Sequence, residues 1–152
     1  LYISMEAKKI LQLNEIWWLV TPQNPLKISE PATYNDRVYN CKKISKNLPI
    51  NVKEIEKKIS SKFTYQTLNY ILNHYSNIKF FWLMGADNLI NFHKWRNWKK
   101  ISKLATIVVF ARSKYSIKAL NSVAAKRLPK GTWKYISDKK INISSSLIRK
   151  FW

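Results

Sequence analysis

The chain has 152 residues, of which 28 are lysine or arginine and 8 are aspartate or glutamate, so its formal net charge is +20. This length corresponds to about one domain with room for a core, and a hydrophobic fraction of 46% indicates a globular chain. The single cysteine, Cys41, excludes an internal disulfide, and with only two histidines there is no zinc-like ligand set. We therefore expect no protein-held metal site and a reducing, cytoplasmic location.

The distribution of apolar and charged residues argues against two further classes, membrane proteins and dedicated nucleic-acid-binding proteins. No apolar run approaches the roughly 18 residues that a membrane span needs, so we expect no membrane partner. The lysines are scattered over nearly every segment, which indicates a basic surface that favours anionic small molecules rather than a dedicated nucleic-acid partner. A basic nucleic-acid-binding module remains an alternative, because clustered lysine and arginine neutralise phosphates.

Helix and strand patterns alternate along the chain. In order, the first half predicts a helix at 1–13, a strand at 15–21, a proline-rich loop at 21–33, a helix at 34–44, a strand at 48–52, a helical turn or two at 53–59 and a helix at 64–75. The second half predicts a strand at 79–85, a helical or turn region at 86–102, a strand at 105–111, a helix at 119–128, a strand at 132–137 and a helix at 144–152.

Strands that are apolar on both faces and separated by helices predict parallel pairing. We therefore expect an α/β fold, a Rossmann-like open parallel sheet with helices on both faces, in a single domain over 1–152. Ligands of such sheets bind at the carboxyl ends of the strands, so the segments that follow the strands are the candidates for chemistry. They are "TPQNPLK", "GADNL", "ARSKY" and "SSSLIR".

Two of these segments contain residues that suit a nucleotide. Ser145 and Arg149 lie four apart and so share one helical face, where the free amides of the first turn form an anion site. Gly85 permits a close approach of the backbone to a ligand, and Asp87 is a carboxylate at the same strand end. Each pattern also has a plain structural explanation, a serine cap in the first case and a turn glycine with a capping aspartate in the second.

The segment after "GADNL" is rich in aromatic residues. Trp95 and Trp98 are three apart and are expected to share a helical side, which is more often a core stripe than a platform for a ligand. His93 is more often a solvated or core histidine than a catalytic base.

Four segments, in this order, resemble one family: "WWLVTPQNPLK", "FTYQTL", "WLMGADNLINFHKW" and "ISSSLIR". They are similar to the bacterial nicotinate-nucleotide adenylyltransferases of the nucleotidyltransferase superfamily. The resemblance implies adenylyl transfer from ATP, with Mg²⁺, to nicotinate mononucleotide, giving deamido-NAD and pyrophosphate. A sister enzyme acting on nicotinamide mononucleotide or pantetheine phosphate is the alternative, and a homo-oligomer is possible.

The resemblance also implies roles for individual residues. Arg149 and Lys27 would act on the reacting phosphates. The ATP-binding residues would be Gly85, Asp87, Arg112, Ser145, Ser146 and Arg149. For nicotinate mononucleotide, Trp95 would stack on the nicotinate ring while the backbone around Thr64 and Arg96 receives its carboxylate.

This sequence departs from the family at several positions. Leu26 stands where histidine is frequent, Phe63 where tyrosine is usual, and Ser113 with Lys114 replaces a common Pro-Gly. The family opens with a strand, a glycine-rich loop and a His-x-Gly-His type motif, and nothing here matches them. We therefore expect an N-terminally truncated domain that lacks its first strand and half of its ATP site, and a chain that is catalytically silent as given.

We predict that Arg149→Ala, in a protein with the N-terminal motif restored, lowers turnover and ATP affinity without unfolding the domain. Loss of one charge-assisted contact to a phosphate removes about 1.5 to 3 kcal/mol, on the order of tenfold to a hundredfold in rate. Steady-state kinetics beside a melting curve measure this. Unchanged kinetics at an unchanged melting temperature would exclude the phosphate role.

Overall fold

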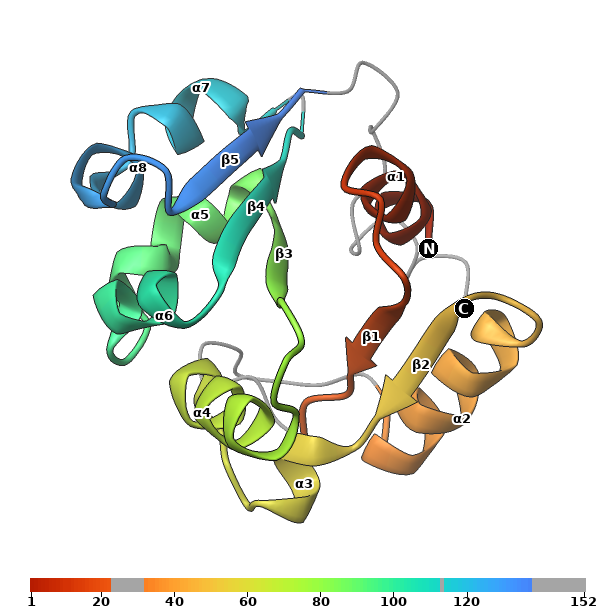
Figure 1. Ribbon diagram of the computed structural model, residues 1–152. Helices are drawn as coiled ribbons and strands as arrows, with labels where there is room; N and C mark the ends of the chain where they lie inside the picture. The colour runs from red at the N-terminus through yellow and green to blue at the C-terminus, as the bar shows by residue number, and fades with distance from the viewer. Residues whose placement is uncertain (23–31, 113, 138–152) are drawn as a thin grey trace. The chain divides into compact units, whose positions relative to one another are not determined.

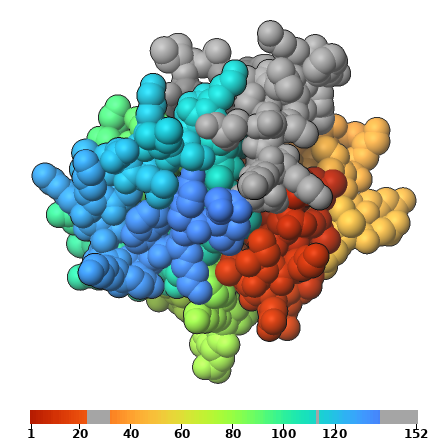
Figure 2. Space-filling view, turned by 90° about the horizontal axis from the view of Figure 1, so that it is seen from above, coloured from red at the N-terminus to blue at the C-terminus, as the bar shows by residue number. Residues whose placement is uncertain are grey.

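The computed structural model describes residues 1–22, 32–112 and 114–137. The chain divides into two compact units, Leu1–Ser76 and Asn77–Trp152 (Figure 1). Residues outside the described ranges are grey in Figures 1 and 2, and they include the predicted site residues Lys27, Ser145, Ser146 and Arg149. The predicted helix at 144–152 and most of the loop at 21–33 also lie outside the described residues.

The first unit alternates helices and strands as the sequence predicts. Its elements are α1 (Tyr2–Ile10), β1 (Ile16–Leu19), α2 (Tyr34–Ser45), β2 (Ile50–Lys53), α3 (Ile55–Lys58) and α4 (Thr64–His74). Strands β1 and β2 pair in parallel, with Ile16 opposite Ile50 and Leu19 opposite Lys53. Because parallel neighbours end at the same edge, the segments that follow β1 and β2 emerge side by side.

Local signals explain where the elements of the first unit begin and how they are joined. Thr33 caps α2, since its hydroxyl accepts from the backbone N–H of Asp36 at 3.2 Å. Trp18 on β1 donates its indole N–H to the Ser4 hydroxyl at 2.9 Å and so attaches α1 to the strand. The buried apolar residues of this unit are Ala7, Ile16, Val20, Val38, Ile50, Ile55, Leu68 and Ile71.

The second unit contains a three-stranded parallel sheet of order β3-β4-β5. Its elements are β3 (Phe81–Gly85), α5 (Ala86–Asn91), η1 (Phe92–Lys94), α6 (Trp98–Leu104), β4 (Thr106–Phe110), α7 (Ser116–Leu120), α8 (Val123–Arg127) and β5 (Trp133–Ile136). The central strand is buried on both faces, with residues 107–110 all 0% exposed. That explains why its sequence is a continuous apolar run.

The helices of the second unit gather on one face of this sheet. Helix α5 contacts β3 and β4 and also contacts α7 and α8, so these helices form one layer (Figure 1). Right-handed crossovers that run in one direction along a sheet, from β3 to β4 to β5, place both connections on the same face. The predicted α/β fold with parallel strands and intervening helices is confirmed, in two sheets with one in each unit. The single domain over 1–152 and the further strand ahead of Leu1 stay predictions.

The helix predicted at 119–128 is wrong in its extent, because the chain forms two short helices there. Helix α7 begins earlier, at Ser116, and ends at Leu120, and α8 begins after Ser122. Ser122 has extended backbone angles, φ −68° and ψ 159°, and its hydroxyl accepts from the Ala125 N–H at 3.2 Å. A serine that bonds the backbone in this way starts a new helix rather than continuing one.

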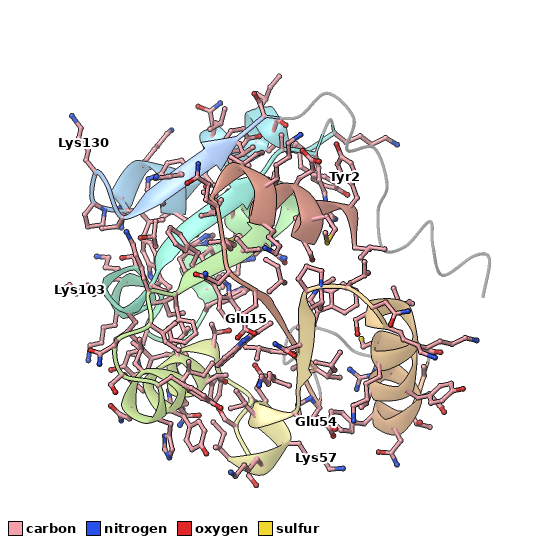
Figure 3. All side chains as sticks on the ribbon, turned by 45° about the vertical axis from the view of Figure 1, so that its right-hand side comes forward. Tyr2, Glu15, Glu54, Lys57, Lys103 and Lys130 are labelled. Carbon is pink, nitrogen blue, oxygen red and sulfur yellow. The ribbon has the colours of Figure 1, made fainter. Side chains whose placement is uncertain are left out.

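The basic side chains are spread over both units. Lys57 lies on α3, Lys103 lies on α6 and Lys130 precedes β5, and all three are exposed (Figure 3). The expectation of a basic surface that favours anionic small molecules rather than a dedicated nucleic-acid partner stays a prediction. Among the described residues, no helix is long and apolar enough to cross a bilayer.

We predict that Ser122→Ala lowers the free energy of unfolding by about 1 kcal/mol, because it removes the cap of α8. For a chain of this size the melting temperature falls by roughly 2 to 4 °C. Replacement of the exposed Ser76 by alanine is the control and leaves the melting temperature unchanged. Equal melting temperatures for the two variants would show that the cap does not stabilise α8.

Candidate active site

Gly85, Asp87 and Arg112 lie together at the carboxyl ends of β3 and β4. Gly85 is the last residue of β3 and pairs in register with Phe110, Asp87 lies in the first turn of α5, and Arg112 follows β4. The Arg112 guanidinium donates through Nη1 to Asp87 Oδ2 at 3.0 Å. The side chains are 20% and 34% exposed, so this ion pair is half-buried rather than a solvated surface pair.

Gly85 matters here because it has no side chain, and not because its backbone adopts a conformation that other residues avoid. Its φ of −81° is open to any residue. A Cβ at this position, however, would lie 2.5 Å from Asp87 Oδ1 and 3.0 Å from Arg112 Nε. The ion pair therefore lies directly over the glycine. The alternative explanation from the sequence, a glycine that serves only to form a turn, is not supported. Asp87 is paired with Arg112, and α5 has no side-chain cap.

Two polar atoms of this cluster are buried without a hydrogen-bond partner among the described residues. They are Asp87 Oδ1, an acceptor, and Arg112 Nε, a donor. Buried polar atoms are costly when unsatisfied, so such a pair is a place where a ligand can complete the bonding. One acceptor beside one donor suits a hydroxyl or an amide, which can both donate and accept.

The expectation that Trp95 and Trp98 share one helical side is wrong. Trp95 ends η1 with extended backbone angles, Trp98 begins α6, and Asn97 between them is left-handed with φ 56°. Asparagine tolerates this conformation, which breaks the helix between the two rings. Both rings nevertheless approach the buried Phe92 edge-on, at centroid distances of 5.2 Å and 6.0 Å.

Trp95 is only partly buried, so part of its ring surface is accessible. Arg96 follows it and is exposed. His93 is also partly buried, and its Nδ1 has no hydrogen-bond partner among the described residues. The interpretation of His93 as a solvated or core histidine rather than a base stays a prediction.

Thr64 lies in the first unit, at the start of α4, whereas Trp95 and Arg96 belong to the second. The turn before Thr64 is held by the buried Ser61, whose Oγ donates to Gln66 Oε1 at 2.8 Å and accepts from the Phe63 N–H at 3.1 Å. These bonds fix the entry of the chain into α4. The backbone around Thr64 is thus held in place before any ligand arrives.

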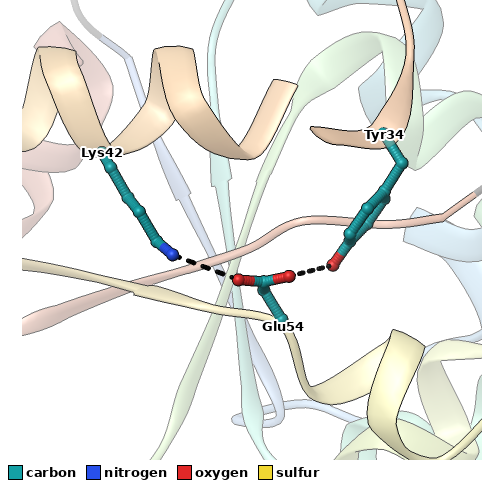
Figure 4. A network of polar contacts seen from close by, with 3 residues as sticks. All are labelled: Tyr34, Lys42 and Glu54. Carbon is teal, nitrogen blue, oxygen red and sulfur yellow. Dashed lines mark hydrogen bonds and ion pairs between the residues drawn. The ribbon is translucent and has the colours of Figure 1, made fainter. Parts of the chain in front are cut away.

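Sequence reasoning missed a polar network after β2. Glu54 accepts from Tyr34 Oη and from Lys42 Nζ, each at 3.2 Å (Figure 4). The hydrogen bond from Lys42 is the main cause that lowers the pKa of Glu54, while burial and then the nearby Glu54 charge raise the pKa of Tyr34 to about 12. The network joins the first residue and the last turn of α2 to the residue that follows β2.

Sequence reasoning also missed Glu56, which is 4% exposed. Its Oε1 accepts from the Thr67 hydroxyl at 3.3 Å, and the Thr21 side chain bonds the same carboxylate. Burial raises the pKa of Glu56, and these two hydrogen bonds oppose that shift. One signal in the sequence points to it, because the segment 53–59 that carries Glu56 directly follows the predicted strand at 48–52.

No group of three or more His, Cys, Asp or Glu side chains that could hold a metal ion occurs in the described part of the chain.

Comparison with known proteins places this chain in a family. Residues 1–151 match the model of the family described as Cytidylyltransferase-like. A probable nicotinate-nucleotide adenylyltransferase of Pelagibacter ubique (strain HTCC1062) is 45% identical over 151 residues, which cover 99% of this chain and 83% of that relative. The chain belongs to the nicotinate-nucleotide adenylyltransferase family. A probable nicotinate-nucleotide adenylyltransferase of Ruegeria sp. (strain TM1040) is 35% identical over 164 residues, covering 97% of this chain and 87% of the relative.

Solved structures agree with this family on the fold. The Plasmodium falciparum nicotinic acid mononucleotide adenylyltransferase complexed with NaAD superposes with a TM-score of 0.74 at 23% identity, over 99% of this chain and 77% of that chain. The same enzyme complexed with APC gives a TM-score of 0.77 at 20% identity, over 99% and 74%. At these identities the likeness shows the α/β fold of the family.

We predict that Gly85→Ala destabilises the protein by about 1 to 3 kcal/mol, because the new methyl group displaces the ion pair above it. In an Asp87→Ala background the same change costs less, since the closest atom is gone. A double-mutant cycle by urea unfolding measures this coupling, expected at about 1 kcal/mol or more.

Gly131→Ala is the matched control for this cycle. Gly131 has a φ of +81° and open space around it, so alanine there is strained but touches nothing within 4 Å. It should lower stability without any coupling to Asp87→Ala. A cost of Gly85→Ala that is equal in both backgrounds would show that the ion pair does not require the glycine.

Proposed function

We propose that this chain transfers the adenylyl group of ATP to nicotinate mononucleotide, in NAD biosynthesis. One observation carries the proposal: over almost its whole length the chain matches relatives named nicotinate-nucleotide adenylyltransferase, at up to 45% identity. The sister reactions on nicotinamide mononucleotide or pantetheine phosphate and the nucleic-acid-binding module are not favoured.

In the proposed reaction, an oxygen of the 5′-phosphate of nicotinate mononucleotide forms a bond to the α-phosphorus of ATP. The bond between that phosphorus and the bridging oxygen to the β-phosphate breaks, and pyrophosphate leaves with the electron pair. Such a transfer is accelerated mainly by alignment and by neutralisation of charge, so no nucleophile with a paired base is needed. The Mg²⁺ arrives with ATP as part of the substrate.

ATP is proposed to bind with its adenosine portion at Gly85, Asp87 and Arg112. The close approach at Gly85 supports this, as do Asp87 Oδ1 and Arg112 Nε, which have no partner among the described residues, because a ribose hydroxyl can donate to the first and accept from the second. For the phosphates, we propose Lys27, Ser145, Ser146 and Arg149 on the strength of the sequence motifs. We propose Lys27 and Arg149 as the residues that act on the reacting phosphates.

Nicotinate mononucleotide is proposed to bind through Thr64, Trp95 and Arg96. The partial exposure of Trp95, with one edge against Phe92, supports a ring that is held in place and still able to stack. The fixed turn before Thr64 supports a backbone that receives the nicotinate carboxylate. A cytoplasmic location and a possible homo-oligomer complete the proposal.

The test is a coupled pyrophosphate assay on the full-length gene product, with ATP, Mg²⁺ and each of the three acceptors. We expect nicotinate mononucleotide to be the preferred acceptor. Equal or faster turnover with nicotinamide mononucleotide or pantetheine phosphate would overturn the acceptor assignment.

Trp95→Ala and Trp98→Ala form a matched pair in this assay, because both rings pack on Phe92. Loss of stacking at Trp95 costs about 1 to 3 kcal/mol, which raises the KM for nicotinate mononucleotide while the KM for ATP stays nearly fixed. Trp98→Ala lowers the melting temperature and leaves both KM values alone. If Trp95→Ala behaves like Trp98→Ala, the ring belongs to the core and does not stack on substrate.

A further inference from the structure

Glu56 connects two parts of the first unit that are distant in sequence. Its carboxylate accepts from the Thr67 hydroxyl on α4, at 3.3 Å to Oε1, and is also bonded by the Thr21 side chain after β1. The side chain is 96% buried, since its exposed fraction is 4%. A buried carboxylate with two hydroxyl donors is bound more firmly than a solvated one, because charge-assisted hydrogen bonds strengthen in a low dielectric.

The same residue holds the other end of the turn that leads into α4. The backbone carbonyl of Glu56 accepts from the Ser61 N–H at 3.0 Å, and the Ser61 hydroxyl in turn accepts from the Phe63 N–H. Thr64 therefore lies between two points, Ser61 and Thr67, that are both bonded to Glu56. Movement of Thr64 relative to β2 would require at least one of these bonds to break.

The Thr21 end of the connection is held as well. Arg37 on α2 donates through Nη1 to the Thr21 carbonyl at 2.6 Å and through Nη2 to the Pro22 carbonyl at 2.8 Å. Thr21 is thus bonded by Arg37 through its backbone and by Glu56 through its side chain. Glu56 therefore connects α4 to Thr21, and the backbone of Thr21 is separately held by Arg37 on α2.

We propose that Glu56 is a positioning residue for the binding of nicotinate mononucleotide. Glu56 bonds the turn before α4, the first turn of α4 and Thr21, and these bonds together fix the position of Thr64. This rests on the proposed function, in which the backbone around Thr64 receives the nicotinate carboxylate. A role in core stability alone does not need a charge, because apolar residues fill buried space without desolvation cost. Glu56 instead retains a buried carboxylate whose Oε2 has no hydrogen-bond partner among the described residues.

The decisive variants change single hydrogen bonds. Thr67→Val removes the hydroxyl that Glu56 binds and keeps the volume, while Thr67→Ser keeps the hydroxyl. Glu56→Ala removes the acceptor, and Glu56→Gln keeps one acceptor oxygen at the same place. Glu54→Ala is the matched control, since it removes a neighbouring carboxylate that bonds Tyr34 and Lys42 instead.

The measurement is the KM for nicotinate mononucleotide and for ATP, with a melting curve, on full-length protein. We expect Thr67→Val and Glu56→Ala to raise the KM for nicotinate mononucleotide roughly tenfold or more, because a small misplacement of a binding group is costly. The KM for ATP should change less than about twofold, within the scatter of distant substitutions. Thr67→Ser, Glu56→Gln and Glu54→Ala should keep both KM values near those of the parent protein.

Thr64→Pro, measured in parallel, separates failure of this proposal from failure of the proposed function. It removes the backbone N–H of Thr64, the first residue of α4, where proline is tolerated because Phe63 before it is extended. If Thr64→Pro leaves the KM for nicotinate mononucleotide unchanged, the Thr64 backbone does not receive the nicotinate carboxylate and the role of Glu56 falls with it. If Thr64→Pro raises that KM while Thr67→Val and Glu56→Ala lower only the melting temperature, the positioning role is overturned and the proposed function stands. Should Glu56→Ala fail to fold, Thr67→Val against Thr67→Ser decides the question.

Discussion

Parallel pairing of the strands determines where the polar groups of this protein meet. In the second unit the register of Gly85 with Phe110 brings the chain beyond β3 beside the chain beyond β4, so that Asp87 reaches Arg112. In the first unit the pairing of β1 with β2 brings Thr21 beside the segment that carries Glu54 and Glu56. Antiparallel pairing would place these groups at opposite edges of their sheets.

The acidic residues are few, and nearly all of those described have specific partners. Only 8 acidic residues stand against 28 basic ones, yet five of the acidic side chains in the described part of the chain accept hydrogen bonds from protein groups. They are Glu15, Asp36, Glu54, Glu56 and Asp87. Each of these five carboxylates therefore has a particular donor within the protein, in addition to its contribution to the charge balance of a basic surface.

The half-buried Asp87 and the buried Glu56 are compensated in different ways. The charge of Asp87 is compensated by the opposite charge of Arg112. This arrangement leaves no room for a methyl group at Gly85. Glu56 is compensated by hydroxyl donors, and burial raises its pKa. The first leaves a donor and an acceptor without partners among the described residues, at the strand end where we propose that ATP binds. The second bonds the chain on both sides of Thr64, which we propose as part of the acceptor site.

The order and type of the elements, the parallel pairing and the family were determined by the sequence. The short length and β-branched content of apolar runs such as 105–111 favour buried strands, and the amphipathic patterns between them favour helices; both signals are local. The split of 119–128 at Ser122 and the break at Asn97 were decided by side-chain and backbone bonds that periodicity does not contain.

The contacts of Glu56 were decided by tertiary structure alone. Its segment, "KEIEKKI", has the composition of a solvated helical turn, and nothing local distinguishes Glu56 from Glu54. Glu56 is buried and Glu54 only partly so, because it is Glu56 that faces Thr21 and Thr67. The bond to Thr21 depends on the pairing of β1 with β2, and the bond to Thr67 depends on the packing of α4, neither of which a local pattern contains.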